Sequence, residues 1–133
     1  MIIKSKRRLK FEELFFLQLQ ILQLKTKRLK SFPGYVFNKK LLFSVFYKNH
    51  LPFNLTVAQK RVIKECYEDM KSGKQMNRLV QGDVGSGKTI VAFSCMLFVV
   101  EAGAQVAFMA PTEVLAEQHS KSILGYSKKL NIN

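Results

Sequence analysis

The sequence predicts an α/β fold, in which an incomplete parallel sheet with flanking helices follows an α-helical linker. From residue 56 onward the apolar pattern indicates helix, strand, helix, strand, helix, and such alternation forms parallel sheets through right-handed crossovers. Residues 1–50 differ, because they hold 12 Lys and Arg against 2 Glu, a net charge of +10 out of +13 for the whole chain. We therefore expect a basic helical and aromatic linker over 1–50 and the N-terminal part of an α/β domain over 51–133.

The first expected element is a helix over residues 11–30. Its leucines and phenylalanines form a broad apolar face at helical spacing, and its acidic residues precede its basic ones, which suits the helix dipole. Glutamines interrupt the apolar run, so it falls short of the ~18 consecutive apolar residues that a membrane span requires. We interpret the helix as docking on a neighbouring domain, in preference to lying on a membrane surface. We expect a cytoplasmic chain with no membrane partner.

Residues 35–50 interleave aromatic and basic side chains after a Pro-Gly turn. Such interleaving is typical of a half-buried linker that covers the edge of a core, which is the interpretation we favour. The alternative is that the rings stack on nucleic-acid bases while the lysines contact phosphates. The side chains concerned are Tyr35, Phe37, Phe43, Phe46 and Tyr47, among Lys39, Lys40 and Lys48.

A second helix is expected from Thr56, a good N-cap, to about Ser72, with Gly73 ending it. The side chains expected to face inward are Val57, Val62, Ile63, Cys66, Tyr67 and Met70. Both cysteines, Cys66 and Cys95, lie in apolar helical patterns, and the chain has no CxxC motif. They are therefore expected to be buried free thiols of a reducing compartment, not metal ligands.

The remaining elements alternate around short apolar runs. We predict strands over 78–81 and 105–110, a helix from about Lys88 to Glu101, and a last helix capped by Thr112 that reaches about Tyr126. Two strands are too few for a parallel sheet, which needs more strands and cover on both faces. A third strand would have to begin near the last residues, 128–133, so we expect a truncated domain.

The loop between the first predicted strand and its helix carries the clearest chemistry. It fits the pattern G-x-x-x-x-G-K-[ST] and comprises Gly82, Asp83, Val84, Gly85, Ser86, Gly87, Lys88 and Thr89. Glycines let the backbone turn tightly and bring its N–H groups close to phosphate oxygens. A glycine turn without a ligand is disfavoured, because a strand precedes the loop and a helix follows it. We predict that the loop binds a nucleoside triphosphate, most simply ATP with Mg²⁺.

Two side chains of the loop have expected roles in that site. Lys88 would reach the β- and γ-phosphates as a point charge, and the Thr89 hydroxyl would be a Mg²⁺ ligand. The motif predicts binding and not hydrolysis. Hydrolysis also needs an acidic residue at the end of another strand, and residues 90–133 contain none in that position.

Three blocks of the sequence resemble the first helicase domain of superfamily-two DNA translocases, and within them the RecG family of ATP-dependent DNA helicases. The blocks are LPFNLTVAQKRVI over 51–63, RLVQGDVGSGKT over 78–89 and MAPTEVLAEQH over 109–119. Residues 8–14 are also similar to the linker helix that precedes this domain. The resemblance implies a RecA-like P-loop fold and a parent enzyme that acts on branched or forked DNA in replication-fork repair and recombination.

The resemblance also implies roles for single residues. Gln59 matches the glutamine that binds the adenine edge, and Phe53 would lie beside that base. Lys88 and Thr89 match catalytic positions of the nucleotide motif. The motif that lies against the DNA backbone matches Pro111, Thr112 and Glu113, with Ala110 ahead of them, and no catalytic role falls to His119.

The family's wedge domain, acidic Mg²⁺ motif and second helicase domain are absent from the sequence. We therefore expect this chain alone to hold an ATP-binding half-site and to be inactive as an enzyme. The alternative is a free-standing basic module that binds nucleic acid, with incidental ATP binding, because polyanions suit its charge. A small kinase or GTPase is disfavoured, because no guanine-binding motif accompanies the loop.

Overall fold

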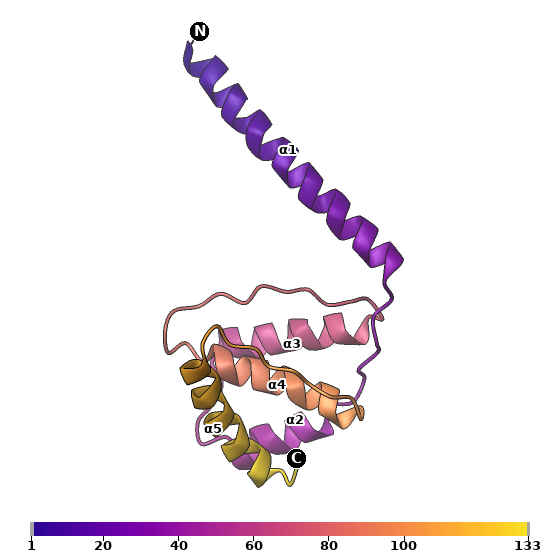
Figure 1. The fold of residues 1–133 in the computed structure, drawn as a ribbon, viewed down its shortest axis with the longest axis vertical. Helices are drawn as coiled ribbons and strands as arrows, with labels where there is room; N and C mark the ends of the chain where they lie inside the picture. The colour runs from indigo at the N-terminus through magenta and orange to yellow at the C-terminus, as the bar shows by residue number, and fades with distance from the viewer. Residues whose placement is uncertain (1, 133) are drawn as a thin grey trace.

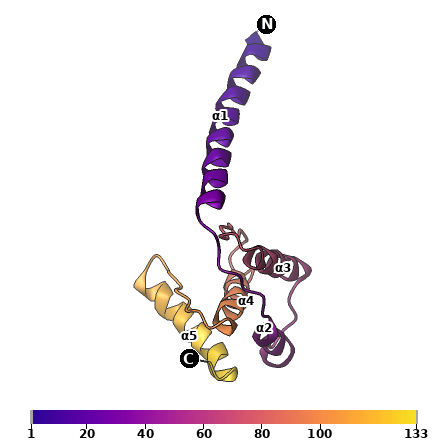
Figure 2. The same ribbon diagram turned by 90° about the vertical axis from the view of Figure 1, so that its right-hand side faces the viewer.

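The computed structural model describes residues 2–132, apart from the side chains of 28–31, and its regular elements are helices (Figures 1 and 2). They are α1 (Ile2–Ser31), α2 (Leu41–Val45), the π-helix η1 (Phe46–His50), α3 (Val57–Lys71), α4 (Lys88–Glu101) and α5 (Glu113–Lys129). Figure 1 shows α1 standing away from a compact part that the other helices form. No helix in the described range is long and apolar enough to cross a membrane.

Helix α1 begins nine residues earlier than predicted, at Ile2. Its first turns consist mainly of Lys, Arg and Leu, which are good helix formers, and Arg8 donates to Glu12 at 2.7 Å across one turn. The apolar side chains of α1 are exposed, Phe11 by 65% and Leu14 by 63%. The docking surface expected for this helix is therefore not buried by the compact part of the chain.

The core lies where α2, η1, α3 and α4 meet. Its buried side chains include Phe46, Leu55, Ile63, Met70, Phe93, Leu97 and Phe98. The Phe46 ring lies 5.0 Å from the Phe93 ring and 5.2 Å from the Tyr126 ring, so α5 also closes over it. The Glu101 carboxylate accepts hydrogen bonds from the N–H groups of Leu41 and Leu42, each at 3.0 Å, which ties α2 to the end of α4.

Residues 35–50 thus cover an edge of the core, as the favoured interpretation predicted, and base stacking stays open to the side chains that remain accessible. Phe46 is only 1% exposed and cannot stack on a base. Phe37, Phe43 and Tyr47 are half-buried and pack against the core. Only part of the aromatic set therefore remains accessible from outside.

Helix α3 has the predicted limits. The Thr56 hydroxyl accepts from the Gln59 N–H at 3.2 Å while the Gln59 side chain accepts from the Thr56 N–H at 2.9 Å, which makes a full capping box. Gly73 has a φ of 70°, the left-handed conformation that ends many helices. The prediction for Val57 was wrong: its side chain is 87% exposed, because the first helical position faces away from α4.

Both cysteines are free thiols, as expected. Cys66 on α3 is buried, whereas Cys95 on α4 is half-buried. A hydrogen bond with Cys95 lowers the pKa of Cys66 to about 7, against the opposing effect of burial. The same contact, together with burial, raises the pKa of Cys95. Among the described residues, no group of three His, Cys, Asp or Glu could hold a metal ion.

The two predicted strands do not form within the described range. Residues 78–81 and 105–110 are without regular secondary structure. The one β-bridge among the described residues joins Pro33 to Lys74, outside both segments. A strand needs a partner about 4.8 Å away to pair its N–H and C=O groups, and neither segment has one. Both segments nevertheless run in the same direction in Figure 1, each ahead of a helix. Residues 130–132 end in a turn and not a strand, and Asn133 lies outside the described residues.

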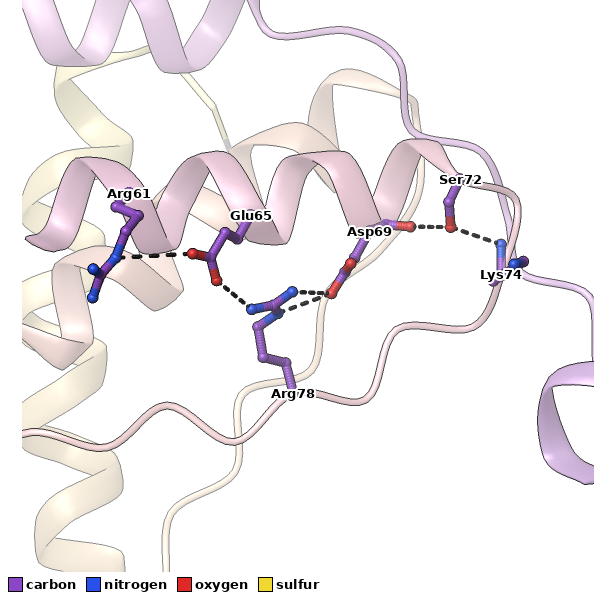
Figure 3. A network of polar contacts seen from close by, with 6 residues as sticks. All are labelled: Arg61, Glu65, Asp69, Ser72, Lys74 and Arg78. Carbon is purple, nitrogen blue, oxygen red and sulfur yellow. Dashed lines mark hydrogen bonds and ion pairs between the residues drawn. The ribbon is translucent and has the colours of Figure 1, made fainter. Parts of the chain in front are cut away.

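An ion-pair network holds the segment that leads to the phosphate loop (Figure 3). The Arg78 guanidinium lies 2.6 Å from the Glu65 carboxylate and 2.7 Å from the Asp69 carboxylate, both on α3. One planar fork can serve two carboxylates at once, which an ammonium group cannot do with the same geometry. Arg78 therefore fixes the course of residues 78–81 along α3.

We predict that Arg78→Ala lowers the free energy of unfolding by about 1–2 kcal/mol, since two partly exposed ion pairs each contribute up to about 1 kcal/mol. Urea titration followed by circular dichroism measures the change. Arg61→Ala is the matched control, because Arg61 approaches the same Glu65 at 3.8 Å and is 73% exposed. Equal stability of the two variants would show that Arg78 does not hold this segment.

Candidate nucleotide-binding site

The phosphate loop is shaped by backbone conformations that only glycine adopts easily. Gly85 has a φ of 78° and Gly87 a φ of 83°, both in the left-handed region. A turn closed by the Ser86 N–H and the Asp83 carbonyl, 3.1 Å apart, brings the chain back toward α4. A Cβ atom on Gly87 would collide with the Gln59 side-chain nitrogen, and one on Gly82 would lie 2.6 Å from Ser86 Oγ. A side chain at either position would therefore have to displace the Gln59 or Ser86 side chain.

Helix α4 begins directly at this loop without a side-chain cap. Its N-cap is Gly87, which makes no capping hydrogen bond, so the first N–H groups of the helix have no side-chain acceptor. Such groups, together with the positive end of the helix dipole, form a binding site for phosphate. The start of α4 can therefore accept an anion.

The Lys88 side chain folds back over the loop. Its Nζ donates to the Gly82 carbonyl at 2.7 Å and to the Asp83 carbonyl at 2.8 Å. An ammonium group has three donors, so one is left, and the two carbonyl contacts can be exchanged for phosphate oxygens. An open cavity of about 590 Å³ lies here, lined by Val80, Gln81, Gly82, Asp83 and Lys88. The loop and Lys88 therefore fit a polyphosphate.

Thr89 follows Lys88 in the first turn of α4 and is half-buried. A hydroxyl in this place suits Mg²⁺ only as one ligand of several, because Mg²⁺ also uses phosphate oxygens, waters and one or two carboxylates. The described residues bring no carboxylate group of three together at this site. Thr89 can therefore supply one ligand of such a site.

Gln59 connects α3 to the phosphate loop. Its Nε2 donates to the Ser86 carbonyl at 2.8 Å, while its Oε1 accepts from the Thr56 N–H. A side-chain amide has two donors and two acceptor positions, so each of these atoms keeps one for a ligand. Phe53, expected beside the adenine, is 49% exposed. The sequence did not reveal the contact between Gln59 and Ser86, because 27 residues separate them.

The proposed DNA-contacting residues lie at the start of α5. Thr112 caps this helix and accepts from the Leu115 N–H at 3.3 Å, so its hydroxyl proton stays available. Pro111 and Glu113 beside it are exposed. Figure 1 shows the segment before Thr112 running in the direction opposite to α4. The His119 ring packs edge-on at 5.1 Å from the Phe108 ring.

Comparison with known proteins agrees with this geometry. An ATP-dependent DNA helicase RecG of Streptococcus pneumoniae is 50% identical over 120 residues, which is 90% of this chain and 18% of the relative. The RecG of Thermotoga maritima is 48% identical over 132 residues, 98% of this chain and 16% of the relative. A solved structure of RecG bound to a three-way DNA junction superposes with a TM-score of 0.85 at 44% identity.

That superposition covers 96% of this chain and 17% of the solved chain. The chain thus spans less than a fifth of the length of the relatives it matches. Its helices and connecting segments follow the RecA-like helicase region of the solved protein, although no sheet forms among the described residues. The sequence profile of the DEAD/DEAH box helicases matches residues 56–133, which hold the capping box, the phosphate loop and the Thr112 cap. The chain belongs to the DEAD/DEAH box helicase family.

Proposed function

We propose that this chain is the N-terminal part of the ATP-binding domain of an ATP-dependent DNA helicase that acts on branched DNA in fork repair and recombination. The observation that carries the proposal is the phosphate loop, in which Lys88 lies against two carbonyls above an uncapped helix start. The 50% identity to a RecG protein over 90% of the chain supports the same assignment. In this proposal residues 1–50 are a linker and residues 51–133 belong to the domain.

In this proposal, different residues of the site bind the phosphates, the Mg²⁺ ion and the adenine of ATP. N–H groups of the loop over 82–87 and of the first turn of α4 hold the phosphates, and Lys88 exchanges its carbonyl contacts for phosphate oxygens. Thr89 supplies a hydroxyl ligand to Mg²⁺, which neutralises phosphate charge when bound. The free donor and acceptor of Gln59 match the N–H and ring nitrogen on one edge of adenine. Each step is binding or orientation, which is all that a half-site can contribute.

The DNA contact would form at the start of α5. N–H groups at the start of a helix and a hydroxyl that can still donate suit a backbone phosphate, which fixes position but not sequence. Thr112 offers that hydroxyl, with Pro111 and Glu113 shaping the approach. In the proposed parent, the segments 78–81 and 105–110 are elements of a parallel sheet completed by strands from outside this chain.

A graft tests the proposed function. We predict that residues 1–133 alone do not hydrolyse ATP, because none of residues 90–133 offers an acidic side chain at the end of a strand to hold Mg²⁺ and water. Residues 1–133 placed into the Streptococcus pneumoniae relative, in exchange for the aligned segment, should restore DNA-stimulated hydrolysis and unwinding of a forked duplex. The same graft with Lys88→Ala is the control. Turnover by the pure chain, or a folded graft without DNA-stimulated turnover, would contradict the proposal.

A separate prediction concerns the choice of base. We expect Gln59→Ala in that graft to weaken ATP about tenfold more than GTP, the loss of roughly one hydrogen bond to a buried edge. Both nucleotides should also lose some affinity, because the bond from Gln59 to Ser86 shapes the loop for either base. Competition of each nucleotide against a fluorescent analogue gives the two constants. An unchanged ratio of ATP to GTP affinity would contradict the proposed contact between Gln59 and adenine, and only its hydrogen bond to Ser86 in the loop would remain.

A further inference from the structure

A second pocket lies on the compact part of the chain, away from the phosphate loop. Its volume is about 300 Å³, and its walls come from α2, η1, α3 and α4. It has no lining residue in common with the cavity at the loop. Although Gln59 and Lys60 are neighbours in α3, successive residues of a helix point in different directions, so Gln59 faces the loop and Lys60 this pocket.

Four aromatic rings form the walls of this pocket: Phe43, Tyr47, Tyr67 and Phe98. The Phe43 ring lies 5.3 Å from that of Phe98 and stacks on that of Tyr47 at 6.2 Å, and the Tyr67 ring lies 4.8 Å from that of Phe98. The Tyr67 hydroxyl donates to the Asn38 carbonyl at 2.8 Å, which fixes that ring. The pocket is thus preformed for a flat apolar group, so little ordering opposes binding.

Three lysines stand around the same pocket, and no acidic residue is among the described residues that line it. Lys60 Nζ lies 5.5 Å from the centre of the Tyr47 ring, and Lys40 Nζ 5.8 Å from that of Tyr67. Lys64 is one turn from Lys60 on α3. None of the three takes part in an ion pair among the described residues, in contrast to Arg61 and Arg78 nearby. The rim therefore favours a ligand that carries negative charge beside a flat ring.

We propose that this pocket binds an unstacked base of single-stranded DNA, with the adjoining phosphates against Lys60 and Lys64. Aromatic walls beside unpaired lysines are the usual means of binding a single strand without sequence preference. A base inside a duplex cannot reach such a pocket, so the site would recognise the unpaired strands of a branch point. The proposal rests on the proposed role of the chain on DNA and adds a site that Thr112 does not provide.

The test is fluorescence anisotropy of a labelled fifteen-nucleotide oligothymidylate with the whole chain, without ATP, over a series of salt concentrations. We expect the double variant Lys60→Gln/Lys64→Gln to bind roughly tenfold more weakly. Its plot of log affinity against log salt should be shallower by about 0.7 for each phosphate that the variant no longer neutralises. The control is Lys121→Gln/Lys128→Gln on α5, which removes the same charge outside the pocket and should not change the affinity by more than about twofold.

Substitutions of Tyr47 separate the contribution of ring stacking to DNA affinity from that of charge. Tyr47→Leu should weaken binding about fivefold or more, as expected for the loss of one stacked base, without changing the salt slope. Tyr47→Phe should bind like the unaltered chain, because it keeps the ring. Thermal melting of each variant checks that it is folded, and an unfolded Tyr47→Leu leaves the lysine pair and Tyr47→Phe to decide.

The outcomes distinguish the two proposals. If the unaltered chain does not bind the oligonucleotide, this inference fails, and the graft decides separately on the role in the parent. If it binds and the pocket variants match the α5 control, the pocket is wrong and the role on DNA stands. A duplex that shows the same dependence on Tyr47 would overturn the preference for unpaired bases. If the pocket variants lose binding of an acidic peptide with a terminal Phe but keep binding of the oligonucleotide, the pocket belongs to a protein partner.

Discussion

Replacing Lys88 with alanine is expected to weaken the binding of a fluorescent ATP analogue with Mg²⁺ about a hundredfold or more, because several charge-assisted hydrogen bonds disappear together. Lys88 Nζ already lies over the loop, 2.7 Å from the Gly82 carbonyl. No other lysine lines the cavity at the loop, so no neighbour can replace the charge. Titration by fluorescence, with the melting temperature as a check of folding, measures the effect.

Two controls make this result specific. Lys74→Ala removes a lysine that lies ahead of the loop and outside its cavity, and should bind the analogue like the unaltered chain. Binding of DNA by Lys88→Ala addresses the basic-module alternative, which predicts DNA affinity without any need for ATP. Salt-sensitive DNA binding that survives Lys88→Ala and disappears on deletion of α1, which leaves the core intact, would favour that alternative. Equal binding of the analogue by Lys88→Ala would contradict the assigned role of the loop.

Helices α3, α4 and α5 could be predicted from the sequence because their limits are set by local signals, whereas α2 and η1 were not predicted. Thr56 and Thr112 cap α3 and α5 through their own side chains, and Gly73 ends α3 by its conformation. The phosphate loop is local in the same sense, since Gly85 and Gly87 adopt φ angles that other residues rarely do. For these elements the information lies within four residues of the position that needs it.

The strands could not be predicted on the same basis, because a strand is defined by a partner that is distant in sequence. Residues 78–81 have the composition of a strand, yet among the described residues they are held against α3 by the ion pairs of Arg78 and not by pairing with another strand. The ion pair of Arg78 with Glu65 could not be predicted from a local sequence pattern, since Glu65 lies 13 residues before Arg78. The length of α1 was also underestimated, because the apolar pattern starts at Phe11 while helix propensity extends to Ile2.

The largest effect on stability is expected from Phe46→Ala, which should lower the free energy of unfolding by about 3–5 kcal/mol. Phe46 is 1% exposed and its ring meets those of Phe93 and Tyr126, so truncation leaves a cavity at the centre of the compact part. A domain is stable by only about 5–15 kcal/mol, so much of the variant would unfold at moderate urea concentration. Urea titration followed by circular dichroism at 222 nm gives the change.

The matched control, Phe16→Ala, removes a ring on α1 that is 59% exposed and should change stability by less than about 0.5 kcal/mol. The comparison also decides where the ATP-binding fold begins. A large cost at Phe46 means that residues 35–50 are part of the folded core, so that the shift in charge at residue 50 does not coincide with the structural boundary. A cost at Phe46 as small as at Phe16 would mean that the segment can separate, and the division into 1–50 and 51–133 would then describe two physical units.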